Sequence, residues 1–154
     1  MIALEPGPAG HFMQRLGPVI TRQWGLPRAI VVMSPHTATT TPFVLGGARH
    51  ETIHDFGGFP QALFDVQYRA PGDPALAERV AELLSPDVVV QHPTRGLDHG
   101  AWGVLKPMYP DADVPVVQLS IDRGRPDRWH YEAGRRLAAL RDEGVLVMGS
   151  GDIV

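Results

Sequence analysis

The fold is decided by a short stretch near the start of the chain, which reads Ala29-Ile30-Val31-Val32-Met33-Ser34-Pro35-His36. Its first five residues are continuously apolar and rich in β-branched side chains, a pattern typical of a strand buried on both faces. The run then ends at a serine, a proline and a histidine. We therefore predict a central strand over 29–33, with His36 at its carboxyl end.

Helical and strand patterns alternate outward from this stretch. Asp73-Pro74 predicts a helix start, since Asp is a good N-cap and Pro is favoured in the first turn, and this helix should end near Ser85. Further helices are predicted over 10–24, where Gly17-Pro18 should kink or divide the helix, and over 127–143. Further strands are predicted over 88–90, 114–121 and 145–148. The alternation predicts an α/β fold with a mainly parallel sheet and helices on both faces.

Ligands of such sheets bind at the carboxyl ends of the strands. His36, His92 and the turn Gly149-Ser150-Gly151 fall at predicted strand ends, so the topology favours a site there. The segment between the strands at 88–90 and 114–121 is expected to be a polar loop that carries Asp98 and His99.

Composition narrows the function to small-molecule chemistry. The 154 residues are 44% hydrophobic, which predicts one domain with one sizeable core. The net charge is −3 and the basic residues are scattered, which argues against a nucleic-acid or membrane partner. The chain has no cysteine, so a metal would need His, Asp or Glu ligands. The sequence shows neither a leader nor a long apolar run, and we expect a cytoplasmic protein.

Seven histidines are the main candidates for chemistry, because imidazole binds metals and moves protons near neutral pH. We expect His11, His50 and His130 to be solvated side chains. His36 is compatible with a metal ligand held by a rigid strand and also with a capping residue. His99 is compatible with a catalytic residue beside Asp98 and also with a hydrogen-bonded loop.

One glycine-rich loop combines a histidine, a carboxylate and two aromatic rings in the sequence His54-Asp55-Phe56-Gly57-Gly58-Phe59-Pro60. This composition suits the binding of a flat aromatic substrate. Aromatic residues beside glycine also commonly close over a core, and the sequence alone leaves both interpretations open.

Five stretches together resemble the class III extradiol ring-cleavage dioxygenases of the LigB-like superfamily, in the 4,5-DOPA extradiol dioxygenase branch. They are 52–60, 68–74, Arg95-Gly96-Leu97-Asp98-His99-Gly100-Ala101-Trp102, 108–120 and 140–151. The resemblance implies cleavage of a catechol ring with O₂ at a non-haem iron(II) site, with zinc as an alternative metal. It implies His36 as a metal ligand, His99 as the acid–base catalyst, and His54 as a substrate-binding residue. Asp98, next to His99, is a further candidate for substrate binding. The oligomeric state is left open, and association of identical chains is compatible with the sequence.

Two departures from the family pattern affect the expected metal site. The family has a His-Gly-Ser-Pro turn before the segment matched by residues 1–6 and a His-Asn pair after the match to 149–151, and each supplies a further ligand. We therefore expect residues 1–154 to form a single but incomplete catalytic domain. The sequence does not decide whether this domain is active by itself. A non-catalytic binding module that keeps the fold is the alternative, and a serine hydrolase using Ser150 is a weaker one because the nucleophile-elbow spacing is absent.

Overall fold

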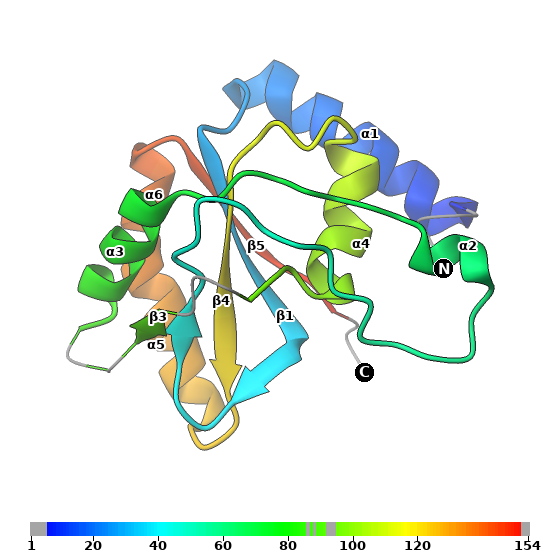
Figure 1. Cartoon of the computed structure of the whole chain (residues 1–154). Helices are drawn as coiled ribbons and strands as arrows, with labels where there is room; N and C mark the ends of the chain where they lie inside the picture. The colour runs from blue at the N-terminus through cyan, green and yellow to red at the C-terminus, as the bar shows by residue number, and fades with distance from the viewer. Residues whose placement is uncertain (1–5, 86, 88, 92–94, 152–154) are drawn as a thin grey trace.

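The structure of the chain, a computed structural model, describes residues 6–85, 87, 89–91 and 95–151. His92, predicted to lie at a strand end, is outside the described residues. A five-stranded sheet with the strand order β3-β2-β4-β1-β5 forms the centre of the molecule (Figure 1). Within the described residues, no helix combines the length and the apolar character needed to cross a membrane.

The sheet is mainly parallel, as predicted. Its central strand β1 (Ala29–Thr39) pairs in parallel with β4 (Val116–Asp122) and with β5 (Val145–Gly149). The short strands β2 (Phe43–Val44) and β3 (Val90–Gln91) are parallel to each other, and β2 is antiparallel to β4. Two residues are too few to give a periodic pattern, which explains why β2 was not predicted from the sequence.

β1 is longer than predicted and irregular in its second half. The predicted strand ended at Met33, whereas β1 continues to Thr39. Its register with β4 shifts between Met33 and Ala38. His36 therefore lies inside an irregular segment of the strand, and not after it. Such an irregularity re-aims side chains without ending the strand.

Helices cover both faces of the sheet, which confirms the predicted α/β architecture. α1 (Gly7–Trp24) and α4 (His99–Met108) lie on one face. α3 (Pro74–Leu83), α5 (Asp127–Leu137) and α6 (Ala139–Asp142) lie on the other, and the short α2 (Gln61–Phe64) belongs to a long connection (Figure 1). A hydrophobic core lies on each face of the sheet, and successive side chains of β1 pack into the two cores in turn. Ile30 and Val32 belong to the core on the side of α4, and Ala29 and Val31 to the core on the side of α3 and α5.

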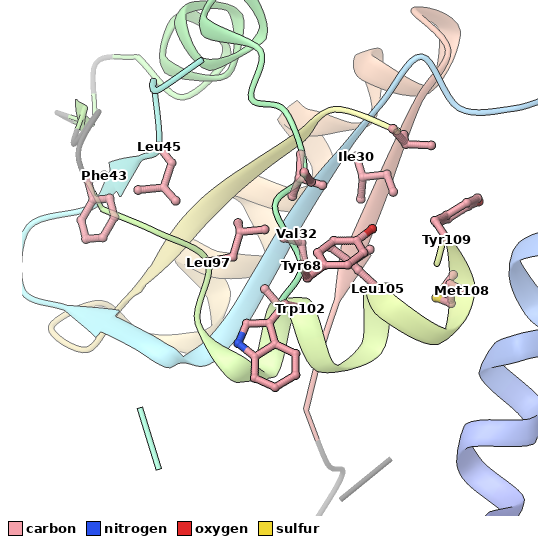
Figure 2. Close-up of a cluster of buried hydrophobic side chains, with 14 of the residues drawn as sticks. Ile30, Val32, Phe43, Leu45, Tyr68, Leu97, Trp102, Leu105, Met108 and Tyr109 are labelled. Carbon is pink, nitrogen blue, oxygen red and sulfur yellow. The ribbon is translucent and has the colours of Figure 1, made fainter. Parts of the chain in front are cut away.

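The core between the sheet and α4 contains the largest buried side chain of the described residues, Trp102 (Figure 2). Its ring is fully buried, and its indole N–H donates to the carbonyl of Ile53 at 2.8 Å. Figure 2 shows Trp102 and Leu105 on α4 in the same buried cluster as the β1 residues Ile30 and Val32. This packing fixes the position of α4 relative to β1.

The helix α4 was not predicted, since its segment was expected to be a polar loop. Gly100, Gly103 and Pro107 lower its intrinsic helix propensity and conceal the apolar pattern. Burial of the face that includes Trp102, together with an N-cap by Asp98, outweighs this preference. The expectation of a loop was therefore wrong because tertiary packing determines this element.

Other helix predictions had mixed outcomes. α3 begins as predicted, with the Asp73 carboxylate accepting from the N–H of Leu76 at 2.9 Å. α1 is not divided at Gly17-Pro18, and it runs unbroken from Gly7 to Trp24. The helix predicted over 127–143 is divided at Ala138 into α5 and α6. Gly144, at a φ of +75°, follows as the predicted C-terminal stop.

Gly17 permits the close approach of α1 to α4. A Cβ atom at this position would lie 2.1 Å from the backbone carbonyl oxygen of Met108, a distance that only a backbone shift could relieve. Glycine is therefore required here by packing between the two helices and not by a turn.

Replacing Gly17 with alanine should lower the free energy of unfolding by about 1–3 kcal/mol, because the added methyl group overpacks the α1–α4 contact. Urea unfolding would measure the change. Gly134→Ala on α5 is the matched control, since nothing lies within 4 Å of its Cβ position. This control should stabilise the chain by about 0.5–1 kcal/mol through helix propensity. Equal effects of the two substitutions would contradict the packing argument.

His50 is buried, and the prediction that it is solvated was wrong. Its side chain is only 2% exposed, and its Nε2 lies 2.7 Å from the carbonyl oxygen of Val116 at the start of β4. Burial lowers the pKa of His50 below its ordinary value of 6.5, although hydrogen bonds to the backbone oppose this change. The folded chain therefore keeps this ring neutral at pH values where the unfolded chain begins to protonate it.

This difference predicts an acid-dependent loss of stability. Because the pKa of His50 is lowered in the folded state, this ring does not reduce the free energy of unfolding above pH 6.5. As the pH falls from 6.5 toward the folded pKa, the unfolded chain binds a proton that the folded chain does not, and the free energy of unfolding decreases. His50→Gln should flatten the dependence of unfolding free energy on pH between about pH 5 and 7. Urea unfolding across this range is the measurement. The exposed His11 gives the control His11→Gln, which should keep the wild-type dependence.

Candidate metal and acid–base site

Three side chains from distant parts of the chain converge at the irregular part of β1. His36 comes from β1, Asp55 from the loop before α2, and His99 from the first residue of α4. One ligand atom of each lies within 4.8 Å of the others, and the two imidazole ring centres are 3.9 Å apart. The two histidines that the sequence singled out are therefore neighbours.

Two small residues make room for the pair of rings. The backbone N–H of His36 donates to the Ser34 hydroxyl at 3.3 Å, within the irregular part of β1. A Cβ atom on Gly100 would lie 2.2 Å from the Ser34 Oγ and 2.8 Å from the His36 Cδ2. Only glycine therefore allows the first turn of α4 to approach β1 closely enough to bring His99 beside His36.

Asp55 holds His99 through two bonds. One oxygen of its carboxylate accepts from both the backbone N–H and the ring Nδ1 of His99, each at 2.9 Å. Because a carboxylate acceptor requires a proton on Nδ1, a neutral His99 ring presents Nε2 as a proton acceptor. The contact thereby selects the tautomer that a general base needs.

The surroundings keep the Asp55 carboxylate charged. Burial alone would raise the pKa of Asp55, but the hydrogen bonds from the backbone and the ring of His99 outweigh burial and lower this pKa below its ordinary value. The carboxylate also faces the N-terminus of α4, where the helix dipole favours negative charge. Asp55 is therefore suited to stabilise a protonated His99.

Asp55 was not among the predicted site residues, although its loop was. The side chains of Asp55 and His99 are 44 positions apart in the sequence, and no spacing rule links them. The available signal was a carboxylate directly beside His54 in a loop rich in aromatic residues. Only the packing of that loop against α4 reveals the pair.

His54 belongs to an aromatic cluster beside the site. Its Nε2 bonds with the carbonyl of Val66 at 2.9 Å, and its ring contacts Phe56, Phe64 and Trp102. The ring of Phe56 also contacts His99 edge to face, with the ring centres 5.4 Å apart. The structure thus connects His54 to the site through Phe56, and its role in substrate binding stays a prediction.

Asp98 and Ser150 lie close to the site but are engaged elsewhere. The Asp98 side chain is fully buried and caps α4 by accepting from the N–H of Ala101 at 2.9 Å. Its role in substrate binding stays a prediction, and the contacts that the structure shows are with the backbone of α4 and with buried polar side chains. The Ser150 hydroxyl donates to the carbonyl of Gly100 at 2.6 Å, so it joins the end of β5 to α4.

The donor set of this site fits a divalent transition metal. Two imidazoles and one carboxylate are the ligands that non-haem iron(II) uses in its facial site, and zinc accepts the same donors. Among the described residues, His36, Asp55 and His99 form a group whose ligand atoms are close enough to serve together.

Removing the ring of His99 should change the titration of Asp55. In His99→Ala the backbone N–H bond remains while the ring bond is lost, so the pKa of Asp55 should rise from its lowered value. The carboxyl carbon of Asp55, followed by NMR against pH, is the measurement. His54→Ala, which leaves both bonds to Asp55 in place, should not change this pKa. An unchanged pKa in His99→Ala would show that the ring contact is unimportant.

Comparisons with known proteins show which family the chain resembles. Residues 5–154 match the family described as the catalytic LigB subunit of aromatic ring-opening dioxygenase. A protein of Escherichia coli (strain K12) named 4,5-DOPA dioxygenase extradiol is 55% identical, over 100% of this chain and 56% of that protein. A protein of Beta vulgaris with the same name is 48% identical, over 81% of this chain and 48% of that protein.

A solved structure shows the same fold. The crystal structure of an uncharacterized protein from Escherichia coli K12 superposes with a TM-score of 0.80 at 45% sequence identity, covering 98% of this chain and 55% of that one. The chain thus spans about half the length of the relatives that it matches. The chain belongs to the family of the catalytic LigB subunit of aromatic ring-opening dioxygenases.

Proposed function

We propose that this chain carries part of the catalytic domain of an extradiol dioxygenase that opens a catechol ring with O₂. The contact of His99 with Asp55 beside His36 is the observation that carries the proposal. The family and the names of two relatives support a dihydroxyphenyl substrate of the DOPA type. Residues 1–154 contribute to this activity as a single domain.

His36 is the proposed metal ligand in this chain, with iron(II) as the preferred ion and zinc as the alternative. When bound, the metal would supply Lewis acidity toward a catecholate and a path for electrons to O₂. β1 carries His36, and the absence of a side chain at Gly100 leaves room for its imidazole. Asp55 and His99 are near enough to complete the donor set, and the experiments below separate this role from proton transfer.

His99 is the proposed acid–base catalyst. Its Nδ1 proton is held by Asp55, so Nε2 is the atom that takes a proton from a catechol hydroxyl. The charged Asp55 then stabilises the imidazolium that results, and the same Nε2 can later return the proton. Phe56 contacts the His99 ring edge to face.

Oxygen uptake coupled to a yellow ring-opened product tests this proposal. The chain is loaded with iron(II) under anaerobic conditions and given DOPA or another catechol. His36→Ala should abolish turnover together with metal binding, whereas His99→Ala should keep the metal and lower kcat by about 10²–10⁴-fold. His11→Ala on the exposed surface of α1 is the control and should behave as the wild type.

The two variants also distinguish the two roles of His99. Loss of the metal in His99→Ala, measured by elemental analysis, would assign this residue to the metal site in place of acid–base catalysis. Product formation that is unchanged in both variants would overturn the proposed function. A wild-type chain without bound metal or turnover would instead support a binding module that retains the fold.

A further inference from the structure

A buried polar network lies directly behind the two site histidines. It consists of Thr37 on β1, Asp98 before α4 and Gln118 on β4, whose exposed fractions are 2%, 0% and 0%. Thr37 follows His36 in the sequence, and Asp98 precedes His99. Each site histidine is therefore adjacent along the chain to a member of this network.

The hydrogen bonds of the network satisfy all three side chains. The Thr37 hydroxyl donates to Asp98 Oδ2, and it accepts from Gln118 Nε2 at 3.0 Å. Gln118 Nε2 also donates to Asp98 Oδ2 at 2.6 Å, while Gln118 Oε1 accepts from the Asp98 backbone N–H at 3.3 Å. At the outer edge, the exposed Arg95 donates to the Thr37 hydroxyl at 3.2 Å.

These hydrogen bonds are compatible with only one orientation of the Gln118 side-chain amide. With its amide reversed, Gln118 would place an N–H group against the Asp98 N–H and an oxygen against the Asp98 carboxylate. A buried carboxylate is costly unless it is fully hydrogen-bonded, so the network determines where Asp98 lies. Asp98 in turn caps α4, the helix that begins with His99.

The network also connects β1 to β4 by side-chain hydrogen bonds where their backbone pairing is interrupted. The register between β1 and β4 is interrupted between Met33 and Ala38, which is the segment that contains His36. Gln118 pairs with Val32 just before this interruption, and its side chain reaches across to Thr37. The side-chain bond therefore fixes the strand where the regular ladder does not.

We infer that Gln118 and Thr37 are positioning residues, which act through Asp98 to hold His36 and His99 in their mutual geometry. The inference rests on the proposed function for its catalytic meaning, although the geometry that it concerns can be measured without turnover. Replacing a residue that orients a metal ligand without binding the metal typically lowers metal affinity or activity by about 10- to 100-fold. Neither residue touches the imidazoles directly, so neither is expected to exchange protons with substrate.

The test compares two substitutions of Thr37 in the metal-free chain. Thr37→Val keeps the shape and removes the hydroxyl, whereas Thr37→Ser keeps the hydroxyl. Nitrogen-15 NMR of the imidazole rings at a fixed pH above neutrality reports whether the His99 proton resides on Nδ1, with the signal assigned by its loss in His99→Gln. Thr37→Val should lose the single Nδ1–H tautomer, and Thr37→Ser should retain it.

Val117→Ala separates positioning from general destabilisation. Val117 is the β4 neighbour of Gln118, it is fully buried, and it packs in the core on the opposite face of the sheet. This variant should lower the stability while keeping the His99 tautomer. Gln118→Met, which removes the amide at similar length, is the second variant if Thr37→Val does not fold, and it should give the same loss.

Affinity for Zn²⁺, measured by calorimetry, is the second measurement, and it should fall about 10- to 100-fold in Thr37→Val with recovery in Thr37→Ser. The inference is overturned if Thr37→Val keeps the wild-type tautomer, if Thr37→Ser also loses it, or if Val117→Ala loses it equally. A wild-type chain that binds no Zn²⁺ would count against the proposed metal site alone, since the NMR comparison does not depend on the metal.

Discussion

The geometry of the site depends on one fully buried carboxyl group, that of Asp98. A carboxylate without contact to water is tolerated only with a complete set of hydrogen bonds, because its desolvation otherwise costs several kcal/mol. Here the partners come from β1, from β4 and from the first turn of α4. The requirement to satisfy this single group therefore joins three elements at the point where the site histidines meet.

The central strand β1 has two roles in succession along its length. Its first half is apolar on both sides and joins the two cores, with alternating residues facing opposite layers of helices. Its second half departs from the regular register and exposes His36 beside α4. A strand buried on both faces thus leads directly into the irregular segment, which is an arrangement suited to holding a ligand in a fixed position.

The chemistry of the site arises from contacts between segments that are distant in the sequence. Asp55 reaches His99 from a long connection whose aromatic side chains pack against Trp102 and against the His99 ring. The same packing sets the tautomer of His99 and keeps the Asp55 carboxylate charged. The chain belongs to the LigB family, and its structure brings two histidines and a carboxylate together, although the chain covers only about half of each relative.

The sequence by itself determined the elements whose signals are local. The apolar run at 29–33 required a buried strand, Asp73-Pro74 began a helix, and motifs around His36 and His99 marked both histidines as site candidates. Tertiary structure decided what depends on packing between distant segments. It made α4 a helix despite its glycines and proline, buried His50 against β4, and paired Asp55 with His99. The physical reason is that burial and long-range hydrogen bonds outweigh local propensity, and neither is encoded in residue spacing.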